Sequence, residues 1–152
     1  MAVNGYEIGP GADLTNATLV EGDLTGANLL RANLTDANLT GANLAEAKLT
    51  MAILENANLT GANLTAANLT GTKLNDADLA YTNLTNAKFK DTNLRDTNLF
   101  YADLTGANLK CANFEGVNLT GANLTSANLT VANLTGANLT NANLEEVIGL
   151  DR

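Results

Sequence analysis

The sequence predicts an all-β solenoid, in which short strand-and-turn units wind around an apolar interior. Three observations support this prediction. Leu stands at every fifth position from Leu14 to Leu144, with Phe only at Phe89 and Phe114. A small residue, usually Ala, stands two places before each of these positions, and the residue between the two is Asn or Asp in most units. Such a repeat winds into a solenoid because each unit buries its apolar face only by stacking on a neighbour.

The five-residue period excludes a helix and a plain strand. An α-helix would spread the leucines around its whole surface, and a strand repeats every second residue. Within a unit, however, the two apolar residues lie two places apart, as Ala122 and Leu124 do. Residues at this spacing share one face of an extended segment, so Asn123 points outward. The remaining two residues, Thr125 and Ser126, must turn the chain.

The residues that turn the chain predict two kinds of corner. Gly or Asn at the third turn position favours a type II turn, which needs a positive φ there. Some units place a bulkier residue at this position, and for these we expect a negative φ. Examples are Glu21, Arg31, Tyr81 and Val131.

The segments ADLTN at 12–16, ANLTG at 57–61 and ANLTS at 122–126 match a known repeat unit, A(D/N)LXX. Over residues 12–146 the chain resembles the pentapeptide repeat family, and its regularity resembles the cyanobacterial members. The resemblance implies a right-handed quadrilateral parallel β-helix with four units per coil, here about seven coils. Five units depart from the motif at the outward Asn or Asp, where we expect no harm to the fold: Thr18, Lys48, Ile53, Lys73 and Lys88.

A solenoid needs caps on its terminal coils. Residues 1–11 are predicted to form an N-terminal cap, with Tyr6 and Ile8 over the first coil. Residues 147–152 are predicted to form a short C-terminal cap, long enough for one helical turn with Val147, Ile148 and Leu150 as a lid. Because this second cap is small, we expect end-to-end homodimers.

Coils of twenty residues place residues i and i+20 above one another. Tyr81 and Tyr101 are spaced in this way and Phe100 precedes Tyr101, so the three form either a contact patch or a ladder that only stabilises its strands. Five of the eight basic residues share one side of the solenoid. This basic side is a second candidate patch or simply a solvated surface: Arg31, Lys48, Lys88, Lys90 and Lys110.

Composition disfavours catalysis and several classes of partner. The chain has no His and a single Cys, Cys111, so no metal site, no cofactor and no enzyme activity are expected. Carboxylate pairs such as Asp76 and Asp96 would lie on an open convex surface. The net charge of −8 disfavours direct nucleic-acid binding. No signal peptide or membrane span is visible, so a cytoplasmic location is expected.

These features favour a non-catalytic structural or protein-interaction solenoid. The resemblance also implies an alternative function. Fluoroquinolone-resistance members of the family mimic DNA and bind DNA gyrase, and this chain could do the same. The basic side and the uninterrupted register disfavour that alternative. Ice binding is a further alternative, because outward Thr residues recur at twenty-residue intervals on one face: Thr65, Thr85, Thr105 and Thr125.

Overall fold

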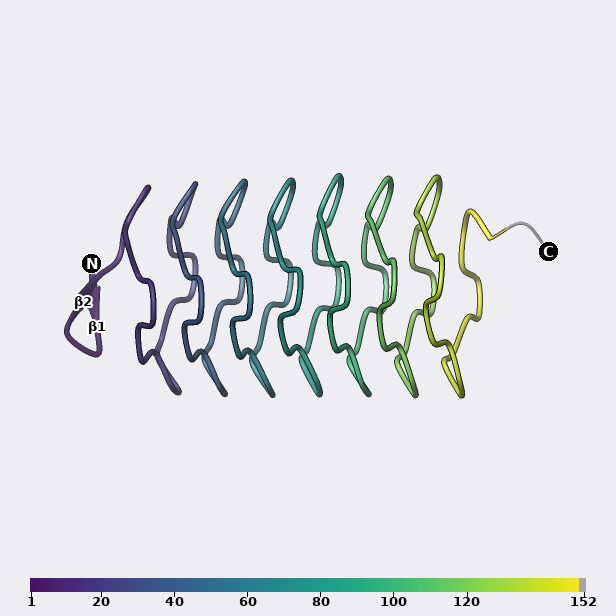
Figure 1. Cartoon of the computed structure of the whole chain (residues 1–152), viewed down its shortest axis with the longest axis horizontal. Coiled ribbons are helices and arrows are strands. Elements are labelled where there is room, and N and C mark those ends of the chain that lie inside the picture. The colour runs from purple at the N-terminus through teal and green to yellow at the C-terminus, as the bar shows by residue number, and fades with distance from the viewer. Residues whose placement is uncertain (151–152) are drawn as a thin grey trace.

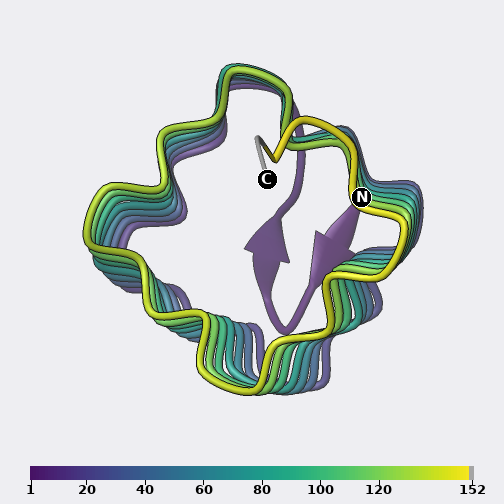
Figure 2. The ribbon, with the colours of Figure 1, turned by 90° about the vertical axis from the view of Figure 1, so that its right-hand side faces the viewer.

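A computed structural model describes residues 1–150 as a stack of coils that begins with a small hairpin (Figure 1). Parallel bridges join residues twenty apart, such as Asp13 with Asn33, and continue to the bridge between Asn128 and Ile148. Four pentapeptides therefore make one coil, and the cross-section has four sides (Figure 2). This is the right-handed quadrilateral parallel β-helix that the resemblance implied. The only named strands in residues 1–150 are β1 (Ala2–Val3) and β2 (Tyr6–Glu7).

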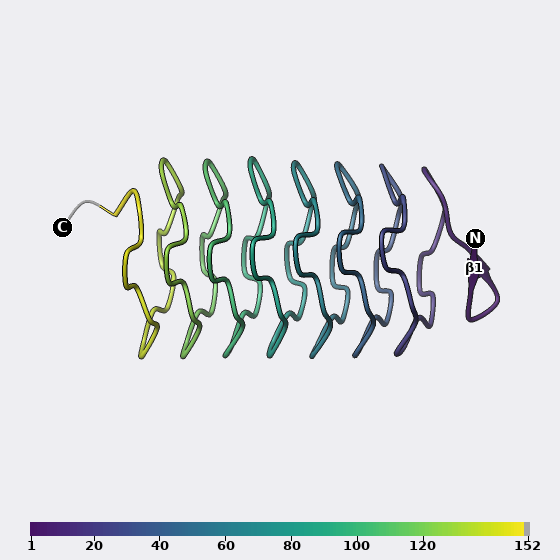
Figure 3. The same cartoon turned by 180° about the vertical axis from the view of Figure 1, so that it is seen from behind.

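Each side of the coil is named here by its first central Leu. The first face begins at Leu14, the second at Leu19, the third at Leu24 and the fourth at Leu29. Seen from behind, the coils keep the same stacking along the whole solenoid (Figure 3). The regular series of bridges shows that no insertion breaks the register between residues 13 and 148.

The interior is built from the residues at every fifth position, as the sequence predicts. Leu64, Leu84 and Leu104 are fully buried, as are Phe89 and Phe114. Four threonines take the place of the small inward Ala, and each donates its hydroxyl to a buried carbonyl oxygen at 2.6–2.8 Å. The core therefore accepts these polar groups without leaving them unpaired: Thr72, Thr82, Thr92 and Thr97.

The backbone hydrogen bonds of one pentapeptide explain the repeat. In the unit centred on Leu34, the amides of Leu34 and Asp36 donate to the following coil, and the amide of Asn33 donates to the preceding coil. The amide of Ala37 closes the corner on the Leu34 carbonyl at 3.0 Å. The fifth amide, of Thr35, donates to the Asn33 side chain at 3.1 Å. All five amides are thus paired, as backbone donors in a folded chain must be.

The prediction of two kinds of corner was wrong. The third turn position has a positive φ in every unit, including 51° at Glu21, 58° at Tyr81 and 60° at Val131. From Asn16 to Ser126, the amide at this position donates to a carbonyl of the next coil, as the amide of Tyr81 does to Phe100 at 2.9 Å. A left-handed residue costs about 1–2 kcal/mol, but a negative φ would misdirect that amide and disturb the stacking. The ladder therefore outweighs the local preference of the bulky residue.

The hairpin of β1 and β2 covers the N-terminal coil. Its two turn residues, Asn4 and Gly5, both have positive φ, as a tight hairpin turn requires. The first coil has no coil before it to pair its free backbone groups. The side chain of Asn4 donates to the Val20 carbonyl at 3.2 Å, and the Tyr6 hydroxyl accepts from the Thr18 amide at 3.2 Å. Ile8 is buried in the core cluster and Tyr6 packs against it.

The C-terminal end differs from the expected helical turn. Residues 147–150 contain no helix, and Ile148 instead pairs with Asn128 as a further bridge. Val147 and Leu150 pack against the core while remaining partly exposed, whereas Ile148 is mostly exposed. The predicted cap also included residues 151 and 152, which lie outside the described residues. In residues 1–150, no helix has the length and apolarity to cross a bilayer.

Candidate interaction surfaces

The aromatic cluster consists of Tyr81, Phe100 and Tyr101, and the structure brings all three together. The two tyrosines occupy the corner between the second and third faces in successive coils. Their rings stack with centroids 6.1 Å apart and planes 15° apart. Phe100 meets Tyr81 edge-on at 5.6 Å and Tyr101 edge-on at 4.6 Å. Tyr81 is 59% exposed and Tyr101 55% exposed, so the cluster forms part of the surface.

Small neighbours make room for these rings. A Cβ added to Gly121 would lie 2.8 Å from the ring of Tyr101, so a larger residue at this corner of the next coil would displace that ring. Ala80 stands one coil before Phe100 in the same column and is buried, although most residues at this outward position are not. A side chain larger than Ala80 would occupy the space beside the aromatic rings.

Fold stability alone does not account for the aromatic cluster. Each aromatic pair stabilises the fold by about 0.5–1.5 kcal/mol. The left-handed corner conformation costs about 1–2 kcal/mol at each Tyr, so the two contributions largely offset each other. Glycine, which takes this conformation without strain, fills the same corner at Gly41 and Gly61. The large exposed rings therefore make the fold little more stable than Gly at the same corners would.

Charge is distributed unevenly around the aromatic cluster. Within residues 1–150, the second and third faces carry no Lys or Arg. Their charged residues are all acidic: Glu21, Asp23, Glu46, Asp78, Asp103, Glu145 and Glu146. The cluster lies on the edge that these two faces share, so the charged residues on both faces beside it are acidic.

The basic side is the fourth face, and its lysines do not form one compact group. Lys88 and Lys90 point outward on either side of the buried Phe89. Lys110 lies beside Lys90 in the next coil, where its carbonyl accepts the Asp91 amide at 3.2 Å. Lys48 pairs through Asn68 with Lys88 and so lies two coils away.

Solvation weakens the electrostatics of this basic side. Lys90 approaches Asp91 at 3.9 Å, but both side chains are more than half exposed. Such a pair contributes little to stability. The fourth face therefore presents three close lysines and one distant lysine.

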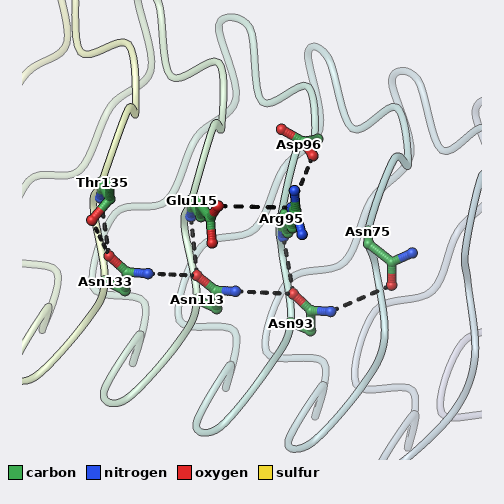
Figure 4. A network of polar contacts seen from close by, with 8 residues as sticks. All are labelled: Asn75, Asn93, Arg95, Asp96, Asn113, Glu115, Asn133 and Thr135. Carbon is green, nitrogen blue, oxygen red and sulfur yellow. Dashed lines mark hydrogen bonds and ion pairs between the residues drawn. The ribbon is translucent and has the colours of Figure 1, made fainter.

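The first face carries a polar network (Figure 4). The side-chain amides of Asn133, Asn113 and Asn93 donate in series from coil to coil, at 3.1–3.5 Å, ending on the Asn75 oxygen. Arg95 donates to Asp96 at 3.2 Å. A shallow open depression of about 460 Å³ lies beside these groups, lined by Glu55, Lys73, Asn75, Asp76, Asn93, Arg95 and Asp96.

The first-face depression lacks the features of a reactive site. Its acidic and basic side chains nearly balance, and its openness keeps them hydrated. Asp76 and Asp96, the carboxylate pair noted in the sequence, both line it. Within residues 1–150, no group of three or more potential ligands could hold a metal ion. Cys111 is a free, partly buried thiol at a corner of the fourth face.

The role of the outward Asn or Asp escaped sequence reasoning. Wherever the outward residue is Asn or Asp, its Oδ1 accepts the amide two residues later, and often the Thr hydroxyl as well, as Asn63 does from Thr65. In the first coil, these bonds from Thr15 hold the pKa of Asp13 below its usual value, the hydroxyl having the larger effect and the amide the smaller. Thr25 lowers the pKa of Asp23 in the same way. The pairing of Asn or Asp with Thr two places on is the signal that could have revealed this role.

Two family descriptions cover almost the whole repeat. The description "Pentapeptide repeat region" matches residues 47–124, which is half of the chain. The chain belongs to the pentapeptide repeat family. The description "Pentapeptide repeats (8 copies)" adds matches over residues 11–45 and 112–148. None of the curated proteins matches this pentapeptide repeat chain.

Solved structures of other pentapeptide repeat proteins share the fold. HetL, from the cyanobacterium Nostoc sp. strain PCC 7120 and involved in heterocyst differentiation regulation, is 36% identical; the match covers 93% of this chain and 74% of HetL, with a TM-score of 0.63. A pentapeptide repeat protein from the Arabidopsis thaliana thylakoid lumen is 33% identical, over 62% of this chain and 66% of that protein, with a TM-score of 0.61. QnrB1, a plasmid-mediated fluoroquinolone resistance protein, is 21% identical over 88% of this chain and 77% of its own, with a TM-score of 0.64, and shares the fold alone.

Proposed function

We propose that this chain is a non-catalytic protein-interaction solenoid that binds a protein partner through the aromatic cluster. The observation that carries the proposal is the exposure of Tyr81 and Tyr101 on the edge between the second and third faces, where the other corners carry Gly, Asn or Glu. Clustered exposed aromatic side chains are typical of binding hot spots. The rigid stacked rings would also lose little conformational entropy on binding.

The proposal includes the absence of catalysis. General acid–base and nucleophilic chemistry needs groups whose pKa values a secluded pocket has shifted. The open depression on the first face provides no such seclusion, and the sequence contains no His. We further propose that the chain works in the cytoplasm, where a lone thiol such as Cys111 stays reduced.

A consensus variant tests the proposed function. Tyr81→Gly, Phe100→Thr and Tyr101→Gly restore the residues that the second face carries at Thr40–Gly41 and Thr60–Gly61. Quantitative affinity capture from the source cell should lose specific partners with this variant. Replacing Lys88, Lys90 and Lys110 by Asn, Thr and Thr on the fourth face is the matched control and should retain them. Identical partners with both variants would contradict the proposal.

End-to-end association is a second proposal for the assembly state. The side chains of Leu134, Leu139 and Leu144 are partly exposed in the last described coil, and Ile148 in the same coil is mostly exposed. Covering these apolar groups would favour dimers. Analytical ultracentrifugation should show a concentration-dependent dimer that Ile148→Asp weakens, and a single monomeric species at all concentrations would refute it.

The two alternative functions make separate predictions. A DNA mimic should inhibit supercoiling by gyrase, but the fourth face carries five basic residues against one aspartate, unlike the uniformly anionic surface of DNA. An ice-binding protein should produce thermal hysteresis. On the third face, however, the hydroxyls of Thr65, Thr105 and Thr125 already donate to Asn or Asp side chains. Supercoiling and freezing-point assays decide these alternatives.

A further inference from the structure

We propose that the aromatic cluster recognises an arginine-containing basic segment of a partner protein. This inference rests on the proposed function and names the chemistry of the partner. The cluster lies on the edge shared by the second and third faces, which carry seven acidic residues and no Lys or Arg within residues 1–150. Apolar rings in negative surroundings complement a cationic side chain with a planar, weakly hydrated head group.

Two carboxylates flank the rings. Asp78 lies three residues before Tyr81 on the second face, and Asp103 lies two residues after Tyr101 on the third face. Both are only partly buried, and neither forms an ion pair with any residue in 1–150. A cation seated on the rings would therefore have an uncompensated carboxylate on each side of the corner.

Hydrogen bonds hold these two carboxylates in fixed orientations. Oδ1 of Asp78 accepts the Ala80 amide at 3.0 Å and the Asn98 side-chain amide at 3.1 Å. Oδ1 of Asp103 accepts the amide and hydroxyl of Thr105. In the part of the chain that the structure describes, Oδ2 of each has no partner and can accept a ligand. Fixed acceptors lose little entropy when a ligand binds.

Arginine fits this arrangement better than lysine. A guanidinium group can stack on a Tyr ring while its edge donates to a carboxylate, whereas an ammonium group is compact and strongly hydrated. At an exposed site, one cation–π contact changes affinity by roughly two- to fivefold. The two exposed tyrosines together should account for about a tenfold change in affinity.

Labelled synthetic peptides test the inference directly. An alternating Arg-Ser peptide, a Lys-Ser peptide of equal charge and a Glu-Ser peptide would be titrated into the full chain and followed by fluorescence anisotropy. We expect the Arg-Ser peptide to bind two- to fivefold more tightly than Lys-Ser, and Glu-Ser not to bind. Removing the rings with Tyr81→Gly, Phe100→Thr and Tyr101→Gly should weaken Arg-Ser binding about tenfold and abolish its advantage over Lys-Ser.

Matched charge variants locate the site. Asp103→Asn removes a charge beside the rings while keeping the Oδ1 acceptor, and should weaken Arg-Ser binding roughly threefold. Asp23→Asn makes the same change in the same column four coils away, and should leave binding within about twofold because salt screens it over that distance. Equal effects of the two substitutions would show general charge attraction and overturn the inference.

The remaining outcomes separate this inference from the proposed function. Unchanged Arg-Ser binding after removal of the rings overturns the inference. Protein-only association that is lost when Lys88, Lys90 and Lys110 are replaced would make a second copy the occupant, and also overturns it. If cellular partners depend on the rings but Arg-Ser does not bind, the inference fails and the proposed function stands. If Arg-Ser binding depends on the rings but no cellular partner does, the inference stands and the proposed function fails.

Discussion

The two ends of the solenoid solve the same problem differently. At the N-terminal end, the hairpin buries Leu14, Leu19 and Leu24, which are at most 2% exposed. At the other end of the described chain, Leu134 and Leu139 remain partly exposed, although they occupy the same position in the repeat. The hairpin supplies apolar cover and hydrogen-bond partners together, through Ile8, Tyr6 and Asn4.

This difference shows that an identical unit has a stability set by what lies on either side of it. A coil in the middle is covered twice, whereas the last coil is covered once. In solenoids, stability is close to a sum of unit terms and nearest-neighbour terms. The last coil should therefore open locally at a smaller free-energy cost than the first.

Truncating a core leucine should produce the largest difference between a middle coil and the last described coil. Leu84→Ala in a middle coil removes a fully buried side chain and should destabilise the protein by about 2–5 kcal/mol. Leu139→Ala should cost about 1 kcal/mol, because part of that side chain already contacts water. Urea unfolding followed by circular dichroism measures both. Equal losses would show that the C-terminal coil is as well covered as the middle.

Removing the cap should make the two ends alike. Ile8→Ala deletes the apolar part of the hairpin that is buried against the first coil and should cost about 2 kcal/mol. Tyr6→Phe keeps the ring but removes the acceptor of the Thr18 amide, for about 1 kcal/mol. Hydrogen exchange should then accelerate at the amides of the first coil and not in the middle coils. A uniform acceleration along the chain would contradict this account.

The contribution of an outward Asn to stability should be the same in a middle coil and in the last described coil. Asn58 and Asn138 each accept the amide and hydroxyl of a Thr two residues on, within their own unit. Replacing either by Ala should therefore cost about 1 kcal/mol, the same in a middle coil as in the last one. The same unfolding assay checks this. A much smaller loss at Asn138 would mean that the last coil has already frayed.

Acid should weaken the first coil and spare the last. The pKa values of Asp13 and Asp23 are lowered from the ordinary value of an aspartate, chiefly by the hydroxyls of Thr15 and Thr25. Their contribution to stability is present above the unfolded-state pKa and is lost as pH falls through the lowered value. The last coil has Asn133, Asn138 and Asn143 in the corresponding positions.

As pH falls from about 5 to about 2, hydrogen exchange in the first coil, corrected for the intrinsic rate of amide exchange at each pH, should accelerate relative to the last coil. The double substitution Asp13→Asn and Asp23→Asn keeps the acceptor oxygens and should abolish this pH dependence. A dependence that persists in the double variant would show that other groups titrate.

Sequence reasoning predicted the core well because the inward positions recur with a strict five-residue period. Leu64, Phe89 and Phe114 are all inside, as the five-residue period required. It failed at corners such as Tyr81, where the amide's hydrogen bond to Phe100 in the next coil decides φ and local preference does not. Long-range pairing of this kind leaves no mark in the composition of the corner itself.

For the candidate surfaces too, the repeat period predicted which residues lie together, but not how their side chains are oriented. The twenty-residue spacing was enough to group Tyr81 with Tyr101, and their rings do stack. Which carboxylates flank them with a free oxygen depends on hydrogen bonds made by Asn98 and Thr105. Side-chain orientation of this kind cannot be read from a repeat motif. The roles of the aromatic cluster and of Lys48, Lys88, Lys90 and Lys110 remain predictions for the binding experiments.

Because every corner has the same left-handed backbone, each surface residue occupies a defined position on a rectangular grid. One coordinate counts coils, and the other counts places around the perimeter. The corners of this chain carry residues as different as Gly, Asn, Tyr, Arg and Val with the same left-handed backbone. A group of side chains could therefore be transplanted along the axis in steps of twenty residues without redesigning the interior, so an epitope on this protein can be relocated as a unit.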